Sequence, residues 1–523
     1  MRVVSRMSWA LGGRLMQRKA DAKTLCLRQV VLRIVSCAAL LVATQHQSLA
    51  ASNAEEASSP TNPPRQTTSP LSLGISQARA LAIQYNLSLI LSRAEREQGE
   101  LIDDQARSPY VPFIAVDLGY SDQVSLVAND ERNRSLSYGA QTSWTLPQGT
   151  GLFARLEALE FLSGASFVPT PTNTLQVGLS QPFLRGLGQG VDQLDAARAQ
   201  ARQQKAIFLN ELNSFLLEVE QAYWSLSLAQ NDVAIRIRSI ERAQTQYDEM
   251  TENIRRGLVA EGEIFIVEEN LVFFSQQLIR SKETLELAQA TLARLIRVDP
   301  STEIIATDDL STQSFDPPPS YEESLAIGLE YNPAVQSARE LTTQRRELYE
   351  VASNQYRPQL DLNAAATLSG IDPSRLSAWQ QVFTARQPGW RVGLDFSVPL
   401  DRSPDRARRE AAEIALSRAT TAEEDARDDV RYGLKQALTR WQRRLEVLQL
   451  AENRMRLAMD KLEVEQEKYK SGLSTLANVV LFQRDLDSAR QGLQTARYDV
   501  ILATARHHQL QGTLAASAGV EVD

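Results

Sequence analysis

Two long segments of the chain carry apolar residues at alternating spacings of three and four, a pattern typical of helices that pack on one another. Residues 192–256 contain neither proline nor glycine, which predicts one continuous helix spanning on the order of 100 Å. A second segment, beginning near residue 430, repeats the pattern. The apolar stripes consist of Leu209, Leu212, Leu216, Val219, Tyr223 and Leu226, and of Leu434, Leu438, Trp441, Leu445 and Leu448.

Four shorter segments alternate apolar and polar residues with the period of a β-strand. They are PFIAVDLGY (112–120), TLQVGLSQ (174–181), PQLDLNAA (358–365) and RVGLDFSV (391–398). Strands near 10 residues with one apolar and one polar face suit a membrane barrel that holds water inside. An ordinary sheet with one face on a soluble core has the same alternation, so single strands do not decide between the two.

The order of elements occurs twice along the chain. Tyr85-Asn86 matches Tyr331-Asn332 at an offset of 246 residues, and Gly257-Leu258 matches Gly472-Leu473 at an offset of 215. We therefore expect a first repeat over 71–299, a linker over 300–320, a second repeat over 321–513 and a short tail over 514–523. The two offsets differ by 31 residues, so the first repeat has an insertion between its strands.

That insertion, residues 137–161, reads as an extra hairpin that turns at Pro147-Gln148-Gly149. We expect it to form an extracellular extension rather than two further membrane-spanning strands. This leaves four spanning strands per chain. Four strands cannot close on themselves, and a sheet in lipid must close. Two chains would supply eight strands and three would supply 12, and only the larger ring leaves a channel, so a homotrimer is the simplest assembly.

The N-terminal region predicts export. Arg28 and Arg33 precede the apolar stretch Ile34–Thr44, and the small residues Ser48 and Ala50 fit a cleavage site for signal peptidase. The stretch is shorter than the roughly 20 residues that a membrane-spanning helix needs. We expect residues 1–50 to be a signal peptide and 51–70, rich in Pro, Ser and Thr, to be a disordered lead-in.

Composition gives no support for an enzyme or a nucleic-acid-binding protein. The net charge is −8, and both cysteines, Cys26 and Cys37, precede the expected cleavage site, which excludes thiol chemistry afterwards. His507 and His508 are adjacent and point to different faces of a helix, a poor arrangement for a metal site or a general base. No phosphate loop, nucleophile motif or zinc spacing occurs, so no cofactor and no metal is predicted.

Taken together, these segments resemble the TolC-like outer-membrane efflux protein family. The resemblance rests on the doubled Tyr-Asn, on VGLSQPFLRG (177–186), on VGLDFSVPLDRS (392–403) and on the two Gly-Leu breaks, and it covers 72–513. It implies an α+β membrane protein: a trimeric 12-stranded outer-membrane β-barrel continued by a long α-helical coiled-coil tunnel across the periplasm of a Gram-negative bacterium. It also implies outer-membrane lipid, a periplasmic adaptor and an inner-membrane pump as partners. The chain would then be a passive channel of tripartite efflux or type I secretion.

In that family the Gly-Leu breaks are the periplasmic tips where the adaptor docks. By position, the docking residues here are Arg256, Gly257 and Leu258 of the first repeat and Ser471, Gly472 and Leu473 of the second. Glycine relieves the steric clash of a left-handed turn, and leucine offers an apolar contact. A purely structural role, in which glycine ends the helix and leucine packs on its own hairpin, stays open.

The gate of the tunnel departs from the family pattern. Family members close it with aspartates six and nine residues after the second glycine, whereas this chain has Asn478 and Leu481 there. The first repeat places Glu263 at the position of Asn478, with Glu261 beside it. An acidic constriction from Glu263 and an apolar ring of Leu481 are both possible, and the two glutamates also suit a solvated helix N-terminus. The alternative function is a secreted or periplasmic structural coiled-coil protein without a channel.

Overall fold

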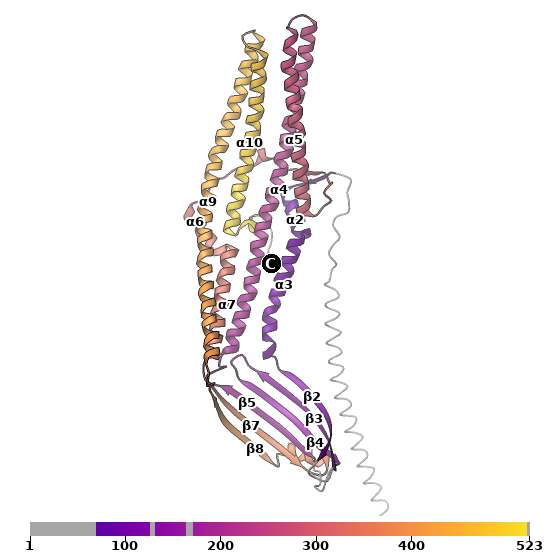
Figure 1. The fold of residues 1–523 in the computed structure, drawn as a ribbon, viewed down its shortest axis with the longest axis vertical. Coiled ribbons are helices and arrows are strands. Elements are labelled where there is room, and N and C mark those ends of the chain that lie inside the picture. The colour runs from indigo at the N-terminus through magenta and orange to yellow at the C-terminus, as the bar shows by residue number, and fades with distance from the viewer. Residues whose placement is uncertain (1–69, 126–130, 164–170, 520–523) are drawn as a thin grey trace, which may run out of the picture. The chain divides into compact units, whose positions relative to one another are not determined.

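The computed structural model describes residues 70–125, 131–163 and 171–519. Both repeats run from a short helix through a longer helix and a set of strands into a very long helix, which a return helix follows (Figure 1). The helices of the first repeat are α2 (Ile75–Tyr85), α3 (Leu87–Arg107), α4 (Gln189–Arg255) and α5 (Ile264–Ile296). Those of the second are α6 (Tyr321–Tyr331), α7 (Pro333–Gln355), α9 (Ser403–Lys470) and α10 (Leu476–Gln511).

The doubled Tyr-Asn motif has the same structural role in both repeats. Asn86 ends α2 and caps α3, and its side-chain amide donates to the Leu295 carbonyl of the return helix at 3.2 Å. Asn332 ends α6 and caps α7, and its amide donates to the Leu510 carbonyl at 2.8 Å. Asparagine suits this position because its oxygen accepts from the free N–H groups of a helix start. The two repeats therefore share this junction down to individual hydrogen bonds.

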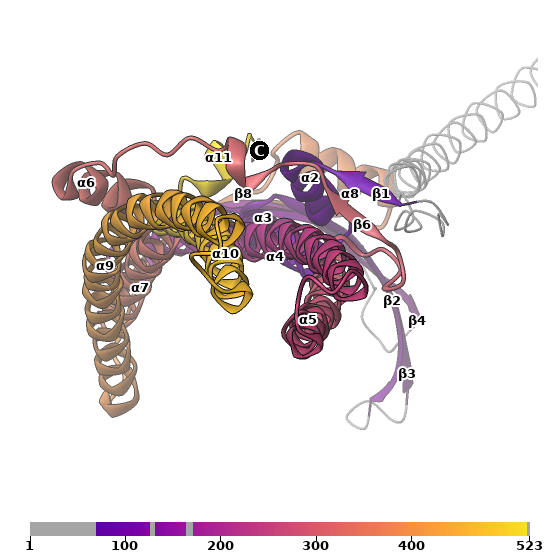
Figure 2. The same cartoon turned by 90° about the horizontal axis from the view of Figure 1, so that it is seen from above.

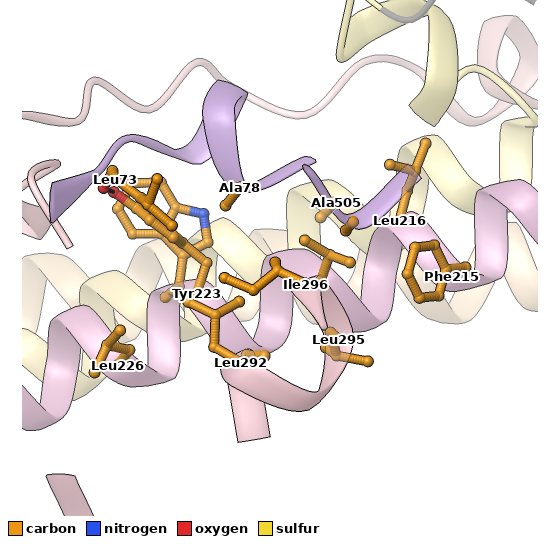
Figure 3. Packing of buried hydrophobic residues seen from close by; sticks show 14 of the residues in the cluster. Leu73, Ala78, Phe215, Leu216, Tyr223, Leu226, Leu292, Leu295, Ile296 and Ala505 are labelled. Carbon is orange, nitrogen blue, oxygen red and sulfur yellow. Dashed lines mark hydrogen bonds between the residues drawn. The ribbon is translucent and has the colours of Figure 1, made fainter. Parts of the chain in front are cut away.

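The long predicted helices are present, and their apolar stripes form the core. Helix α4 contains 67 residues and α9 contains 68. Figure 3 shows the largest cluster of buried apolar residues in the described chain. It joins Leu216, Tyr223 and Leu226 of α4 to Leu292, Leu295 and Ile296 at the end of the return helix α5. Seen along the long axis, α9, α10, α4 and α5 lie side by side along an arc (Figure 2). The coiled-coil prediction is therefore confirmed for packing within one chain.

A small parallel sheet joins the start of the first repeat to the linker. Strand β1 (Leu71–Leu73) pairs with β6 (Ile304–Ala306), and a short 3-10 turn, η3 (Leu310–Thr312), follows. The Tyr223 hydroxyl donates to Asp308 at 2.7 Å, and burial raises the pKa of Tyr223 to about 12. Part of the predicted linker is thus ordered against the helical core.

The main sheet contains six strands rather than the four that the sequence predicted. Its order is β2-β3-β4-β5-β7-β8, with every neighbouring pair antiparallel. The four predicted strands are present as β2 (Phe113–Ser125), β5 (Thr172–Pro182), β7 (Gln359–Ile371) and β8 (Pro388–Ser397). The additional two are β3 (Glu131–Thr145) and β4 (Gly151–Ser163).

The predicted extra hairpin is present, and it is part of the main sheet. It turns where expected, between Leu146 and Thr150, with Gly149 at φ +100°. Strand β3 pairs with β2 over 13 residues and β4 pairs with β5 over nine, so the hairpin lies inside the sheet. Its turn meets the helices, because the Gly188 N–H at the start of α4 donates to the Gln148 carbonyl at 3.0 Å. A hairpin whose edges are both paired cannot be a separate extension.

The two faces of the six-stranded sheet have opposite chemistry. Residues directly paired across antiparallel strands point to the same face, so the register traces rows across the sheet. One row is wholly apolar: Val116, Ala140, Leu156, Leu175, Leu368 and Pro388. The next row, on the other face, is mostly polar: Ala115, Gln141, Arg155, Gln176, Thr367 and Gly389.

A short helix covers the far end of the apolar face. Helix α8 (Arg375–Phe383) connects β7 to β8 and packs on β5 and β7. Gly370 allows this approach, since a Cβ there would lie 2.0 Å from the Ala378 carbonyl oxygen. Arg375 pairs with the buried Glu160 of β4 at 2.7 Å. The charged carboxylate on this face is therefore neutralised and covered by protein.

Candidate docking and gate sites at the hairpin tips

The two predicted tips form the same turn. At the end of α4 the N–H of Gly257 donates to Ile254 and that of Leu258 donates to Asn253. At the end of α9 the N–H of Gly472 donates to Tyr469 and that of Leu473 donates to Lys468. This pair of bonds is the Schellman motif, which requires a left-handed residue just after the helix. Gly257 at φ +69° and Gly472 at φ +72° provide it.

The residues around each glycine are presented to solvent. Leu258 is 69% exposed and Leu473 is 80% exposed, although a leucine at this position of the motif often packs back on its own helix. A Cβ at either glycine would meet nothing within 4 Å. Arg256 pairs with Glu252 at 2.9 Å, and the Ser471 hydroxyl donates to the Glu467 carbonyl. Each tip therefore presents an exposed leucine directly after a turn whose backbone is held by two hydrogen bonds.

The candidate gate residues lie just beyond these turns. Glu261 and Glu263 bound the 3-10 turn η2 (Glu261–Glu263) that leads into α5. In the second repeat Thr475 caps α10, and the Asn478 amide donates to Ser474 at 3.3 Å. Leu481, one turn further along α10, is 54% exposed. Within one chain the structure thus leaves Leu481 unpacked and engages Asn478 in the cap.

Glu263 also has an electrostatic connection to the second tip. Tyr469 lies at the end of α9, just before the second turn. Burial raises the pKa of Tyr469, and the charges of Glu263 and Glu249 raise this pKa further. The apolar cluster at this end joins Met250 and Val267 of the first hairpin to Leu476 and Val480 of the second. The two tips are consequently packed together as one unit.

A buried carboxylate on α10, further from the tip than Leu481, ties the two hairpins together. Asp487 on α10 is 1% exposed and accepts hydrogen bonds from Ser239 and Arg242 of α4, the latter at 2.8 Å. Arg484 adds a contact to Asn270 of α5 at 3.0 Å. Buried charge is tolerated when it is paired and hydrogen-bonded in this way.

Sequence reasoning missed two features of the tips. Phe265, at the start of α5, is largely exposed next to the first turn and extends its apolar surface. Glu465 is buried and accepts from the Ser474 hydroxyl, which, with Lys468, holds the pKa of Glu465 below its usual range. The sequence did contain a sign of the exposed Phe265. This aromatic residue follows Glu263 by two positions and so falls in the first turn of a helix, which is usually polar.

The histidines take a structural position. His507 is buried on α10, with Nε2 3.1 Å from the Ser324 hydroxyl of α6 and the Trp441 ring close by. Burial lowers the pKa of His507 to about 4. In the ranges 70–125, 131–163 and 171–519, no group of three or more His, Cys, Asp or Glu residues is placed to hold a metal ion.

Residues 327–513 match the model of the outer membrane efflux protein family. The match supports, over the second repeat, the family resemblance inferred from the sequence. The match spans α7, the strands β7 and β8, and the long hairpin that ends in Gly472. No helix in the described part of the chain is both long and apolar enough to cross a membrane.

Solved structures share the fold over most of the chain. The CmeC outer membrane channel of Campylobacter jejuni is 17% identical with a TM-score of 0.59, and the match covers 84% of this chain and 86% of that one. The MtrE outer membrane channel of Neisseria gonorrhoeae is 16% identical with a TM-score of 0.61, at 86% and 94% coverage. The outer membrane protein VceC of Vibrio cholerae is 14% identical with a TM-score of 0.58, at 86% and 97%. No curated protein matches the chain.

Proposed function

We propose that three copies of this chain form the outer-membrane channel of a tripartite efflux or type I secretion system. The observation that carries the proposal is the six-stranded sheet, which has one apolar face, one polar face and two unpaired edges, β2 and β8. Unpaired edges and an exposed apolar face are both costly in water. Closing the sheet edge to edge, with the apolar face on lipid and the polar face on a water-filled lumen, removes both costs.

The internal repeat supplies the geometry of the closure. Within one chain the first repeat meets the second where β5 pairs with β7, for example Leu179 with Ala364. Strand β8 corresponds to β5 at the offset of 215, and β2 corresponds to β7 at the offset of 246. We call the contact between β8 of one copy and β2 of the next the seam. Pairing these strands in the same register as β5 and β7 sets Leu394 of β8 opposite Leu118 of β2 in the next copy.

The predicted seam is chemically consistent on the outer face. It also pairs Phe396 with Val116 and Val392 with Tyr120, and all of these side chains are exposed and apolar in the single chain. On the inner face it sets Asp395 beside Asp117, where water in the lumen would screen the two charges. The apolar rows would then run around the whole ring without interruption.

The helical hairpins then extend from the ring toward a partner. Leu258 and Leu473 stand exposed on two matching turns, and Phe265 adds to the first. We assign these tips to a periplasmic adaptor protein that links the channel to an inner-membrane pump. The preorganised Schellman turns favour docking, because a rigid apolar contact loses little conformational entropy on binding.

The gate follows from what each candidate side chain already contacts. The Asn478 side chain already donates a hydrogen bond to Ser474 at the start of α10, whereas the Leu481 side chain is exposed. We therefore assign the constriction to Leu481, with Glu261 and Glu263 lining the approach to it. An apolar ring of this kind closes a pore by excluding water.

Disulfide cross-linking across the predicted seam tests the proposal. In one chain β2 and β8 are the two edges of the sheet, about 24 Å apart for five strand spacings, too far for a disulfide. A Leu118→Cys, Leu394→Cys double variant should therefore cross-link only between copies and give a ladder that ends at three. Leu118→Cys with Trp390→Cys, displaced by four residues along β8, is the control and should stay uncrosslinked.

Two outcomes would contradict the proposal. A ladder that ends at two copies would exclude a trimer. Absence of cross-links, with purification as a detergent-free soluble protein, would favour the alternative of a secreted or periplasmic coiled-coil protein.

A further inference from the structure

The hairpin β3–β4 has the same design as the strands on either side of it. On the face shared with Val116 and Leu175 it presents Ala140 and Leu156, and on the other face it presents Gln141 and Arg155. The apolar face continues along the hairpin through Leu136, Tyr138, Leu152 and Ala154. In a ring whose apolar face lies on lipid, as proposed above, a hairpin with this pattern continues the lipid-facing surface of its neighbours.

The lengths of the two added strands are also sufficient. Strand β3 contains 15 residues and β4 contains 13, as do β2 and β7. A tilted strand needs about 9–11 residues to cross the hydrocarbon of a bilayer. Both ends of the hairpin are anchored as well, by the turn at Gln148 on the helical side and by the Arg375–Glu160 ion pair on the other.

The inner face of the hairpin is fitted to its neighbour. Phe153 of β4 lies over Gly178 of β5, where a Cβ would be 2.6 Å from the Phe153 ring. An aromatic ring that covers a glycine of the next strand is a device that fixes strand register. The contact shows that β4 and β5 are built as permanent neighbours.

We infer that β3 and β4 are membrane-spanning strands of the pore wall. Resting on the proposed trimer, this inference gives a wall of 18 strands instead of 12. Barrel diameter grows roughly linearly with strand number, so the outer-membrane section would be about one and a half times as wide. The chain would then conduct bulkier cargo through this section than a 12-stranded ring admits.

Thiol labelling at neighbouring positions tests the inference. Gln141→Cys and Ala140→Cys are adjacent on β3 but face opposite sides, and both native cysteines precede the expected cleavage site. The full-length protein in outer-membrane vesicles is treated with a water-soluble, membrane-impermeant maleimide. If β3 spans the membrane, Gln141→Cys in the lumen reacts at least ten times faster than Ala140→Cys in lipid.

The second repeat contains the matched control pair. Ala365→Cys and Ala364→Cys lie on β7, which the proposed function already places in the wall, and they face the lumen and the lipid in the same way. A protected Ala364→Cys with a rapidly labelled Ala140→Cys would overturn the inference and leave the channel intact. Rapid labelling of both Ala140→Cys and Ala364→Cys would overturn the proposed function itself.

Discussion

The two repeats of this chain are nearly identical at one end and different at the other. Both long hairpins end in the same Schellman turn, with left-handed glycines only 3° apart in φ and an exposed leucine after each. At the sheet the first repeat contributes four strands, whereas the second contributes two strands and α8. Under the proposed function one kind of partner docks on both turns, which allows little variation between them. A wall made of paired strands can accept a further hairpin wherever its faces match.

The largest expected effect is a loss of export when a charge replaces the exposed leucine of one tip. Leu473→Asp places a charge on the apolar contact of the second tip and should reduce export at least tenfold, because the adaptor contact would bury that charge. Leu258→Asp should do the same at the first tip. The measurement is cellular efflux of a pump substrate, with trimer yield assayed in parallel.

Leu457→Asp provides the control, since Leu457 is also an exposed leucine but lies on α9 away from the tips. It should leave export unchanged. Equal losses for Leu457→Asp and Leu473→Asp would contradict a docking role specific to the tips.

A polar pair in the second repeat replaces an apolar pair in the first. His507 and Ser324 stand at the positions of Leu292 and Ala78, and all four residues are buried. The pKa of His507 is about 4 in the folded chain, below the ordinary value near 6.5. Between these values the unfolded chain binds a proton that the folded chain cannot, so stability falls as pH drops from 6.5 to 4, by at most about 3 kcal/mol.

Thermal unfolding of the detergent-solubilised protein across that pH range checks this prediction. The double variant His507→Leu, Ser324→Ala copies the first repeat and should flatten the pH dependence. His508, whose pKa is also lowered by burial, adds a slope of the same sign that remains in the double variant. An unchanged slope in the double variant would remove His507 as its cause.

Weakening the buried contacts of Asp487, which join the two repeats, should reduce the stability of the fold moderately. Asp487→Asn weakens the buried contacts with Ser239 and Arg242 and should lower stability by roughly 2 kcal/mol. Asp485, two residues earlier on the same helix, is exposed, so Asp485→Asn should be neutral. Melting temperatures of the two variants compare them directly, and equal values would show that the buried network adds nothing.

The smallest effect concerns the glycines themselves. Gly257→Ala and Gly472→Ala force alanine into a left-handed conformation and should each cost about 1 kcal/mol, by the same amount in both repeats. Gly262 lies between them in sequence, has an ordinary φ and has open space around it, so Gly262→Ala should be neutral or slightly stabilising. A clear difference between the two tip variants in thermal unfolding would mean that the turns are not equivalent.

Much of the fold could be predicted because its signals are local and repeated. The apolar spacing fixed the long helices, and the offsets between Asn86 and Asn332 and between Gly257 and Gly472 identified the repeat. The placement of β3 and β4 could not be predicted. Phe153 is apolar on the inner face and Glu160 is charged on the outer face, so the alternation along β4 is blurred. Those residues are explained only by Gly178 and by Arg375, which are distant in sequence.

At the tips the sequence predicted the turns but not their surroundings. The left-handed glycine is a backbone requirement visible in one residue. In contrast, the exposure of Phe265 and the hydrogen bond from Asn478 to Ser474 depend on how α5 and α10 begin, which the spacing of apolar residues does not determine.

A density map of the purified protein in lipid, at a resolution that separates strands, tests the central claim most directly. We predict a closed ring of three copies with 18 strands, in which β8 of each copy lies beside β2 of the next. A ring of 12 strands, made either by two copies or by three copies with β3 and β4 outside the wall, would contradict it.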